Sequence, residues 1–254
     1  MSARSLDSSP RQRHWWKPSL VYVLWVSLSF IASSLVVGFV SVALRDSGIW
    51  QNDDSTVSIN AVVIAMGIAV YGLMLAIMIG LPGLFGRGRV TLKGLGVQRL
   101  PRWKDIGVTL LAVPVYVVLL VMAMMLASYF SWINLDQSQD IGLNMVQPGA
   151  QLWLAFLLLV VIGPVAEELV FRGYLYGKLR ATKAPVWICI VIASALFGAA
   201  HMQWNVAIDT FVIGAVMCVT REITGTIWPS IMMHMIKNSV AFYYLFIVAP
   251  GLGI

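Results

Sequence analysis

The sequence predicts an all-α fold, a polytopic membrane helix bundle of about seven transmembrane helices in a single domain. Of its 254 residues, 59% are hydrophobic and only 11% are charged, and the mean hydropathy is +0.85. These values exclude a soluble globular protein of average composition. The apolar residues also occur in runs that are long enough to cross a hydrocarbon core, with short polar segments between them.

The apolar runs divide the chain into three parts. A basic tail is expected at 1–18, the N-terminal transmembrane helices at 19–130, and a C-terminal group of helices at 150–250. Six of the expected spans cover residues 20–44, 57–81, 106–130, 185–204, 206–220 and 227–248. The fourth span begins near Ala150, and Lys178, Arg180 and Lys183 mark its cytoplasmic end.

The charged residues predict the orientation of these spans. Lysines and arginines gather in the tail and in the segment 85–104, whereas the segment 131–149 contains Asp136 and Asp140 and no basic residue. Because basic residues concentrate on the cytoplasmic side, we expect a multi-pass protein of the cell (plasma) membrane with a cytoplasmic N-terminus. This pattern accounts for the net charge of +6, and no nucleic-acid partner is expected.

Three charged residues, Glu167, Glu168 and Arg172, lie within the fourth span. An ionisable side chain at membrane depth costs at least about 2.5–3.5 kcal/mol, so these three must face protein or water. Glu168 and Arg172 have the i,i+4 spacing that allows pairing on one helical face, while Glu167 is rotated by about 100° and stays available. A buried packing network of all three is the alternative interpretation.

Two histidines, His201 and His234, lie in other expected spans. Measured from the turn between the fourth and fifth spans, Glu168 and His201 each stand about 25 Å along neighbouring antiparallel helices. His234 and Asn238 have i,i+4 spacing and can point into one cavity. Phe197 has the same spacing from His201 and would form an apolar floor beneath that imidazole.

We expect these side chains to converge, with Glu167 facing His201 and Glu168 contacting Arg172. A carboxylate, an imidazole and a carboxamide around one pocket suit the attack of water on a carbonyl. A proton-coupled transporter and a non-catalytic membrane scaffold or immunity protein are the alternatives. The polar residues cluster in the C-terminal half without paired repeats, which favours an enzyme over a transporter.

Three motifs carry a resemblance to a known family. They are Glu167-Glu168-x-x-x-Arg172, Phe197-x-x-x-His201 and His234-x-x-x-Asn238. In this order on consecutive helices they resemble the CPBP family of intramembrane proteases, which includes type II CAAX prenyl proteases and bacteriocin-processing or self-immunity proteins. The resemblance covers roughly residues 151–245 and makes the part 150–250 the catalytic membrane core.

The resemblance also implies roles for the motif residues. Glu167 would be the water-activating base and His201 its partner, and His234 with Asn238 would stabilise the oxyanion. The supporting residues would be Glu168, Arg172 and Phe197.

The activity implied is that of an intramembrane endopeptidase. Its partners would be the lipid bilayer and a hydrophobic or lipidated peptide, either prenylated and CAAX-type or bacteriocin-like. The cofactor stays open between zinc and none. Glu167, His201 and His234 would compose a His₂Glu zinc set, but the sequence has no H-E-x-x-H motif, and a metal-free mechanism with glutamate and water is also proposed for the family.

Overall fold

The computed structural model of the chain describes residues 14–48, 56–84, 90–137, 143, 146 and 149–248. All regular secondary structure in these ranges is helical, which confirms the predicted fold class. Segments labelled η are π-helical, with hydrogen bonds that reach five residues back. The elements are α1 (Trp16–Asp46), α2 (Thr56–Leu75), η1 (Ala76–Gly80), α3 (Leu81–Leu84), α4 (Leu92–Leu95), α5 (Trp103–Ala127), α6 (Ala150–Phe156), η2 (Leu157–Ile162), α7 (Gly163–Glu168), η3 (Leu169–Tyr176), α8 (Gly177–Ala181), α9 (Val186–Ala199), α10 (Trp204–Thr224), α11 (Trp228–Tyr243) and η4 (Tyr244–Val248).

Long apolar helices make the chain an integral membrane protein. Among the residues that the structure describes, 5 helices have the length and composition to cross a membrane: Trp16–Asp46, Asn60–Leu84, Trp103–Ala127, Ala150–Ala181 and Trp228–Val248. The expected spans at 185–204 and 206–220 correspond to α9 and α10, which are helical but are not among these 5. The first helix begins at Trp16, so it extends into the predicted tail 1–18, whose residues 1–13 lie outside the described ranges.

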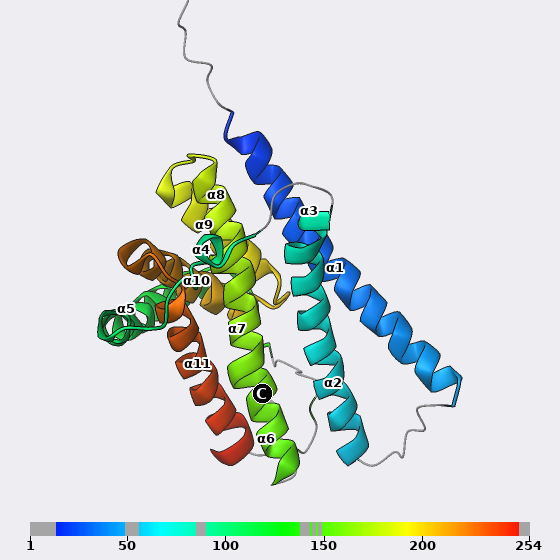
Figure 1. The fold of residues 1–254 in the computed structure, drawn as a ribbon. Coiled ribbons are helices and arrows are strands. Elements are labelled where there is room, and N and C mark those ends of the chain that lie inside the picture. Colours follow the sequence, from blue (N-terminus) through cyan, green and yellow to red (C-terminus); the bar gives the residue numbers. More distant parts are fainter. Residues whose placement is uncertain are drawn as a thin grey trace, which may run out of the picture.

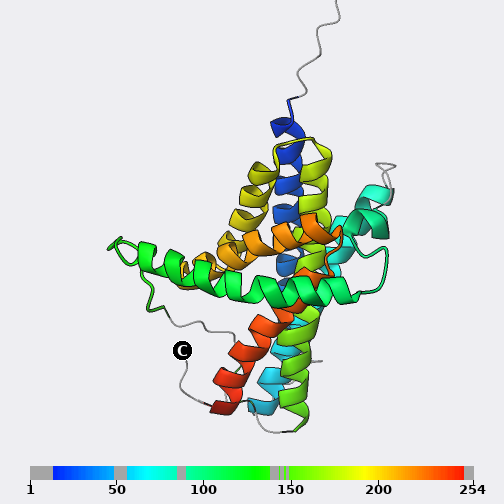
Figure 2. The same cartoon turned by 90° about the vertical axis from the view of Figure 1, so that its left-hand side faces the viewer.

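The continuous helix from α6 to α8 is the central element of the bundle. In Figure 1 it stands between α2 and α11, which both pack against it, and α1 packs along α2 and reaches α8. The hairpin of α9 and α10 contacts η3. α5 lies across the bundle against α10 and α11, so Figure 1 looks nearly along its axis and Figure 2 shows it from the side. The middle of the central helix is therefore surrounded by other helices.

The first helix has the pattern of a helix that faces lipid. Its buried positions include Ser19, Ser29 and Ser33, whereas many of its large apolar side chains are exposed. Small residues let membrane helices approach closely, and their hydroxyls find partners within the helix, since Ser29 Oγ donates to Trp25 O at 2.7 Å. Apolar side chains are as well solvated by lipid as by protein, so the exposed face of α1 suits a bilayer.

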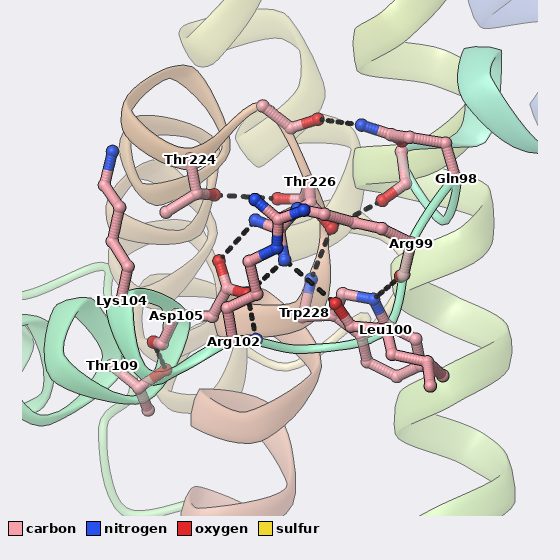
Figure 3. Close-up of polar contacts among 12 residues, drawn as sticks. Gln98, Arg99, Leu100, Arg102, Lys104, Asp105, Thr109, Thr224, Thr226 and Trp228 are labelled. Carbon is pink, nitrogen blue, oxygen red and sulfur yellow. Dashed lines mark hydrogen bonds and ion pairs between the residues drawn. The ribbon is translucent and has the colours of Figure 1, made fainter.

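The segment before α5 docks on the turn between α10 and α11 (Figure 3). Thr226 Oγ1 donates to Gly96 O at 2.6 Å, and Trp228 Nε1 donates to Arg99 O at 2.6 Å. The guanidinium of Arg99 also donates to the fully buried Asp105, with Nη2 at 2.9 Å from Oδ1. These contacts fix the described part of the predicted basic loop to the C-terminal helices.

Glu222 ties the central helix to α10. Its Oε1 accepts hydrogen bonds from Tyr176 Oη at 2.9 Å and from Arg180 Nε at 2.8 Å. Burial opposes the ionisation of Glu222, but the hydrogen bonds from Arg180 and Tyr176 and the charges of Arg180 and Arg221 outweigh burial and lower the pKa of Glu222 from its ordinary value of 4.5. The ionised carboxylate therefore holds the two helices together at neutral pH.

Candidate active site

The central helix departs from regular α geometry where it carries the two glutamates. The short piece α7 lies between the π-helical segments η2 and η3. Gly163 N–H donates to Leu158 O, five residues back, and the next residue, Pro164, has no N–H. If the same five-residue pattern continued, residue 164 would donate to Leu159 O. Because residue 164 is proline, that carbonyl receives no main-chain hydrogen bond from this position. π-helical insertions of this kind are frequent at functional sites.

Asn238 of α11 supplies a donor for that carbonyl. Its Nδ2 donates to Leu159 O at 2.8 Å, which fastens α11 to the central helix one turn from His234. The resemblance implies a place for Asn238 in an oxyanion-stabilising pair, and in the structure the carboxamide also bonds to this backbone oxygen. A carboxamide has two N–H bonds, so one of them remains for a second acceptor.

Glu168 is the anchored carboxylate that the helical spacing predicts. It is fully buried, and its Oε1 accepts hydrogen bonds from Arg172 Nη1 at 2.7 Å and from His234 Nδ1 at 3.0 Å. This contact turns Nδ1 of the imidazole toward Glu168 and leaves Nε2 on the opposite side of the ring. The expected contact between Glu168 and Arg172 is present.

Glu167 is the more open of the two carboxylates. Its side chain is 19% exposed, compared with 0% for Glu168. Its Oε1 accepts a hydrogen bond from Tyr71 Oη of α2 at 2.5 Å, and its Oε2 lies 3.7 Å from His234 Nε2. His234 therefore lies between the two carboxylates, bonded to one and close to the other. No sequence pattern singles out Tyr71, a lone phenol in an apolar run.

His201 was expected to face Glu167, and among the described residues no hydrogen bond joins the two side chains. Within the described part of the chain, the polar partners of Glu167 are Tyr71 and His234, and His201 Nδ1 instead lies 3.0 Å from Phe197 O. The helix α9 ends at Ala199, so His201 stands in the following turn and not, as the sequence predicted, within a helix that continues to residue 204. Its ring folds back onto the end of its own helix.

The ring of Phe197 connects the two histidines. Phe197 is fully buried, and its centroid lies 5.3 Å from that of His201 and 5.7 Å from that of His234, both in edge-on geometry. The guanidinium carbon of Arg172 lies 4.2 Å over the same ring, a cation–π arrangement. Phe197 thus forms an apolar wall for both imidazoles, where the sequence indicated contact with His201 alone.

Lys237 and Asp209 form a separate polar cluster at the junction of α5, α10 and α11. Lys237 Nζ lies 2.9 Å from Asp209 Oδ2, and Tyr116 Oη donates to Asp209 Oδ1 at 2.5 Å. These groups satisfy one another, so the cluster stays outside the candidate site.

The three candidate zinc ligands, Glu167, His201 and His234, do not form a metal-binding group among the described residues. Direct ligation brings donor atoms within about 3–3.5 Å of each other. Glu167 Oε2 and His234 Nε2 are 3.7 Å apart, and His201 contacts Phe197 O. Among the residues that the structure describes, no group of three or more His, Cys, Asp or Glu side chains is arranged to hold a metal ion. The side chains as they lie do not fit a His₂Glu zinc set.

A comparison with models of protein families matches the C-terminal helices to a known family. Residues 149–240 match the family model described as Rce1-like, type II CAAX prenyl endopeptidase Rce1-like. Comparisons with curated proteins and with solved structures gave no match. The matched segment contains all three motifs, and it agrees with the resemblance to CPBP intramembrane proteases. The family implies a protease, and the helices place it in a membrane. Residues 149–240 of this chain therefore match the Rce1-like family model, which is consistent with a CPBP-type intramembrane protease.

Proposed function

We propose that the chain is an intramembrane endopeptidase that hydrolyses a peptide bond of a membrane-associated peptide with water activated by Glu167. The observation that carries this proposal is the unequal state of two adjacent carboxylates. Glu168 is fully buried and bound by Arg172 and His234, whereas Glu167 is 19% exposed and has one oxygen 3.7 Å from His234 Nε2. A general base must reach water, and Glu167 is the carboxylate that can do so.

The proposed mechanism uses protein groups and water. A separation of 3.7 Å between Glu167 Oε2 and His234 Nε2 leaves room for one water that bonds to both, at about 2.7–3.0 Å each. Glu167 takes a proton from this water as its oxygen attacks the carbonyl carbon. It then gives the proton to the amine nitrogen as the C–N bond breaks. His234 and the second N–H of Asn238 stabilise the oxyanion, and His201 lies across Phe197 from His234.

The proposed substrate is a hydrophobic or lipidated peptide that reaches the site through the bilayer. The family match favours a prenylated CAAX-type peptide, and a bacteriocin-like peptide is the second class that the motifs suggest. The basic tail and the basic segment 85–104 favour a cytoplasmic N-terminus.

Cleavage by the purified full-length chain in lipid nanodiscs tests the proposal. Fluorogenic peptides with a farnesylated CAAX end and identical unprenylated peptides are the probes. Glu167→Ala should lower cleavage about 10²–10⁴-fold, since it removes the base. The control Glu222→Ala removes a carboxylate outside the site and should keep cleavage, and thermal unfolding checks that both variants are folded.

Two results would contradict the protease proposal. One is that no peptide is cut by the wild-type chain, and the other is that Glu167→Ala cuts as fast as the wild type. Proton flux into vesicles that depends on Glu167, without cleavage, would favour the transporter alternative.

A further inference from the structure

Tyr71 is a hydrogen-bond partner of Glu167 that lies outside the residues matched by the family model. This residue belongs to α2, in the N-terminal half of the chain, whereas the match begins at residue 149. Tyr71 is partly buried, and its hydroxyl donates to Glu167 Oε1 at 2.5 Å. A helix outside the matched domain therefore contacts the carboxylate proposed as the base.

Two glycines allow α2 to come this close to the central helix. Gly163 lies one turn before Glu167, and a Cβ on it would lie 3.3 Å from Tyr71 Oη and 3.0 Å from Leu158 O. On α2, a Cβ on Gly67 would lie 3.0 Å from Leu158 Cδ2. Small residues at such crossings let membrane helices pack with their backbones close together. Larger residues in place of Gly67 and Gly163 would push α2 and the central helix apart. The two glycines therefore allow the phenol of Tyr71 to reach Glu167.

The contact restricts how the Glu167 carboxylate can turn. With Oε1 bonded to Tyr71, Oε2 is directed toward His234 Nε2 at 3.7 Å. The neighbouring Glu168 is already bonded to Arg172 and His234, so these groups do not compete for Glu167 Oε1. A free carboxylate would sample other rotamers, and a misplacement of about 1 Å can lower a rate about 100-fold.

We infer that Tyr71 is a positioning residue that holds the Glu167 carboxylate toward His234, so that the N-terminal helices complete the site of the C-terminal domain. This inference rests on the proposed function of Glu167 as the base. It assigns α2 a part in the reaction in addition to membrane anchoring.

Turnover by the full-length Tyr71→Phe variant tests this inference. We expect kcat to fall about 10–100-fold with KM unchanged, because the phenol acts on Glu167 and not on the peptide. The matched control is Tyr116→Phe, which also removes a phenol-to-carboxylate hydrogen bond of 2.5 Å, to Asp209. Both variants lose one equivalent bond and should lose similar thermal stability, but Tyr116→Phe should keep its kcat.

A second replacement separates positioning from packing. Substituting 4-aminophenylalanine for Tyr71 keeps an aromatic ring with a donor at the same position, so it should restore most of the lost kcat. A kcat for Tyr71→Phe equal to that of Tyr116→Phe would overturn the inference, and so would failure of the amino analogue to improve on Tyr71→Phe.

A measurement that needs no substrate distinguishes failure of this inference from failure of the proposed function. Unfolding temperatures are compared for Tyr71→Phe, Glu167→Ala and the double variant. If Tyr71 acts by holding Glu167, the double variant unfolds at the same temperature as Glu167→Ala. Additive losses would overturn the inference whether or not any peptide is cut. A wild-type chain that cuts no peptide removes the proposed function and, with it, the role of Tyr71 in turnover.

Discussion

Gly198 determines how closely α9 and α10 approach, and its replacement by alanine tests that packing quantitatively. A Cβ on Gly198 would lie 2.6 Å from Ala207 O, where ordinary contact begins at 3.4 Å. The helices would therefore have to separate by about 0.8 Å, the difference between these two distances. Overpacking costs about 1–3 kcal/mol, and exchanging glycine for alanine in a helix returns about 0.5–1 kcal/mol. The difference is a net loss of about 0–2.5 kcal/mol, and because the obstructing atom belongs to the backbone we expect Gly198→Ala to lie in the upper half of that range.

The matched control for this change is Gly107→Ala in α5. A Cβ on Gly107 would meet nothing within 4 Å, so this variant should gain about 0.5–1 kcal/mol. Denaturant unfolding of both variants in the same detergent, followed by circular dichroism, measures the two changes, which should have opposite signs. If Gly198→Ala is as stable as Gly107→Ala, the close approach of α9 and α10 is wrong. Peptide cleavage should also decrease in Gly198→Ala, since the preceding Phe197 contacts both histidines.

Two further predictions concern charged groups away from the candidate site. Glu222→Gln should lower stability at pH 7 by less than about 1 kcal/mol, because the ion pair is partly exposed. The pKa of Glu222 is lower in the folded chain than in the unfolded chain. The difference in unfolding free energy between wild type and variant should therefore be complete above pH 4.5 and disappear as the pH falls through the folded pKa. Unfolding curves measured across that pH range check this. Lys237→Met and Asp209→Asn should each destabilise the chain, and together they should cost less than the sum, with a coupling of about 0.5–3 kcal/mol in a double-mutant cycle. Additive losses would mean that the two charges do not stabilise each other.

The local parts of the site could be predicted from the sequence because helix geometry alone determines them. Apolar run lengths predicted the long helices, and the i,i+4 spacing predicted the contact of Glu168 with Arg172, which depends only on neighbouring turns of one helix. The placement of Glu167 as the more open carboxylate follows from the same rotation, and its exposed fraction of 19% agrees with it.

The remaining contacts depend on helix ends and on tertiary packing. The sequence predicted that His201 lies within a helix, but α9 ends at Ala199, and His201 Nδ1 contacts Phe197 O from the following turn. Tyr71 reaches Glu167 only because α2 crosses the central helix at Gly163, and the spacing of residues within α2 contains no information about that crossing.

Pro164 has a consequence for the axial position of α11. In a bilayer, apolar side chains gain little by exchanging lipid for protein, so they do not determine at which height two helices meet. A backbone carbonyl without a donor costs several kcal/mol there. Pro164 leaves Leu159 O in need of a donor, and Asn238 Nδ2 meets it at 2.8 Å. Sliding α11 by one turn, about 5.4 Å, would break this bond. Pro164 therefore helps to fix the position of α11 along the axis of the central helix, and with it the depth of His234 beside the two glutamates.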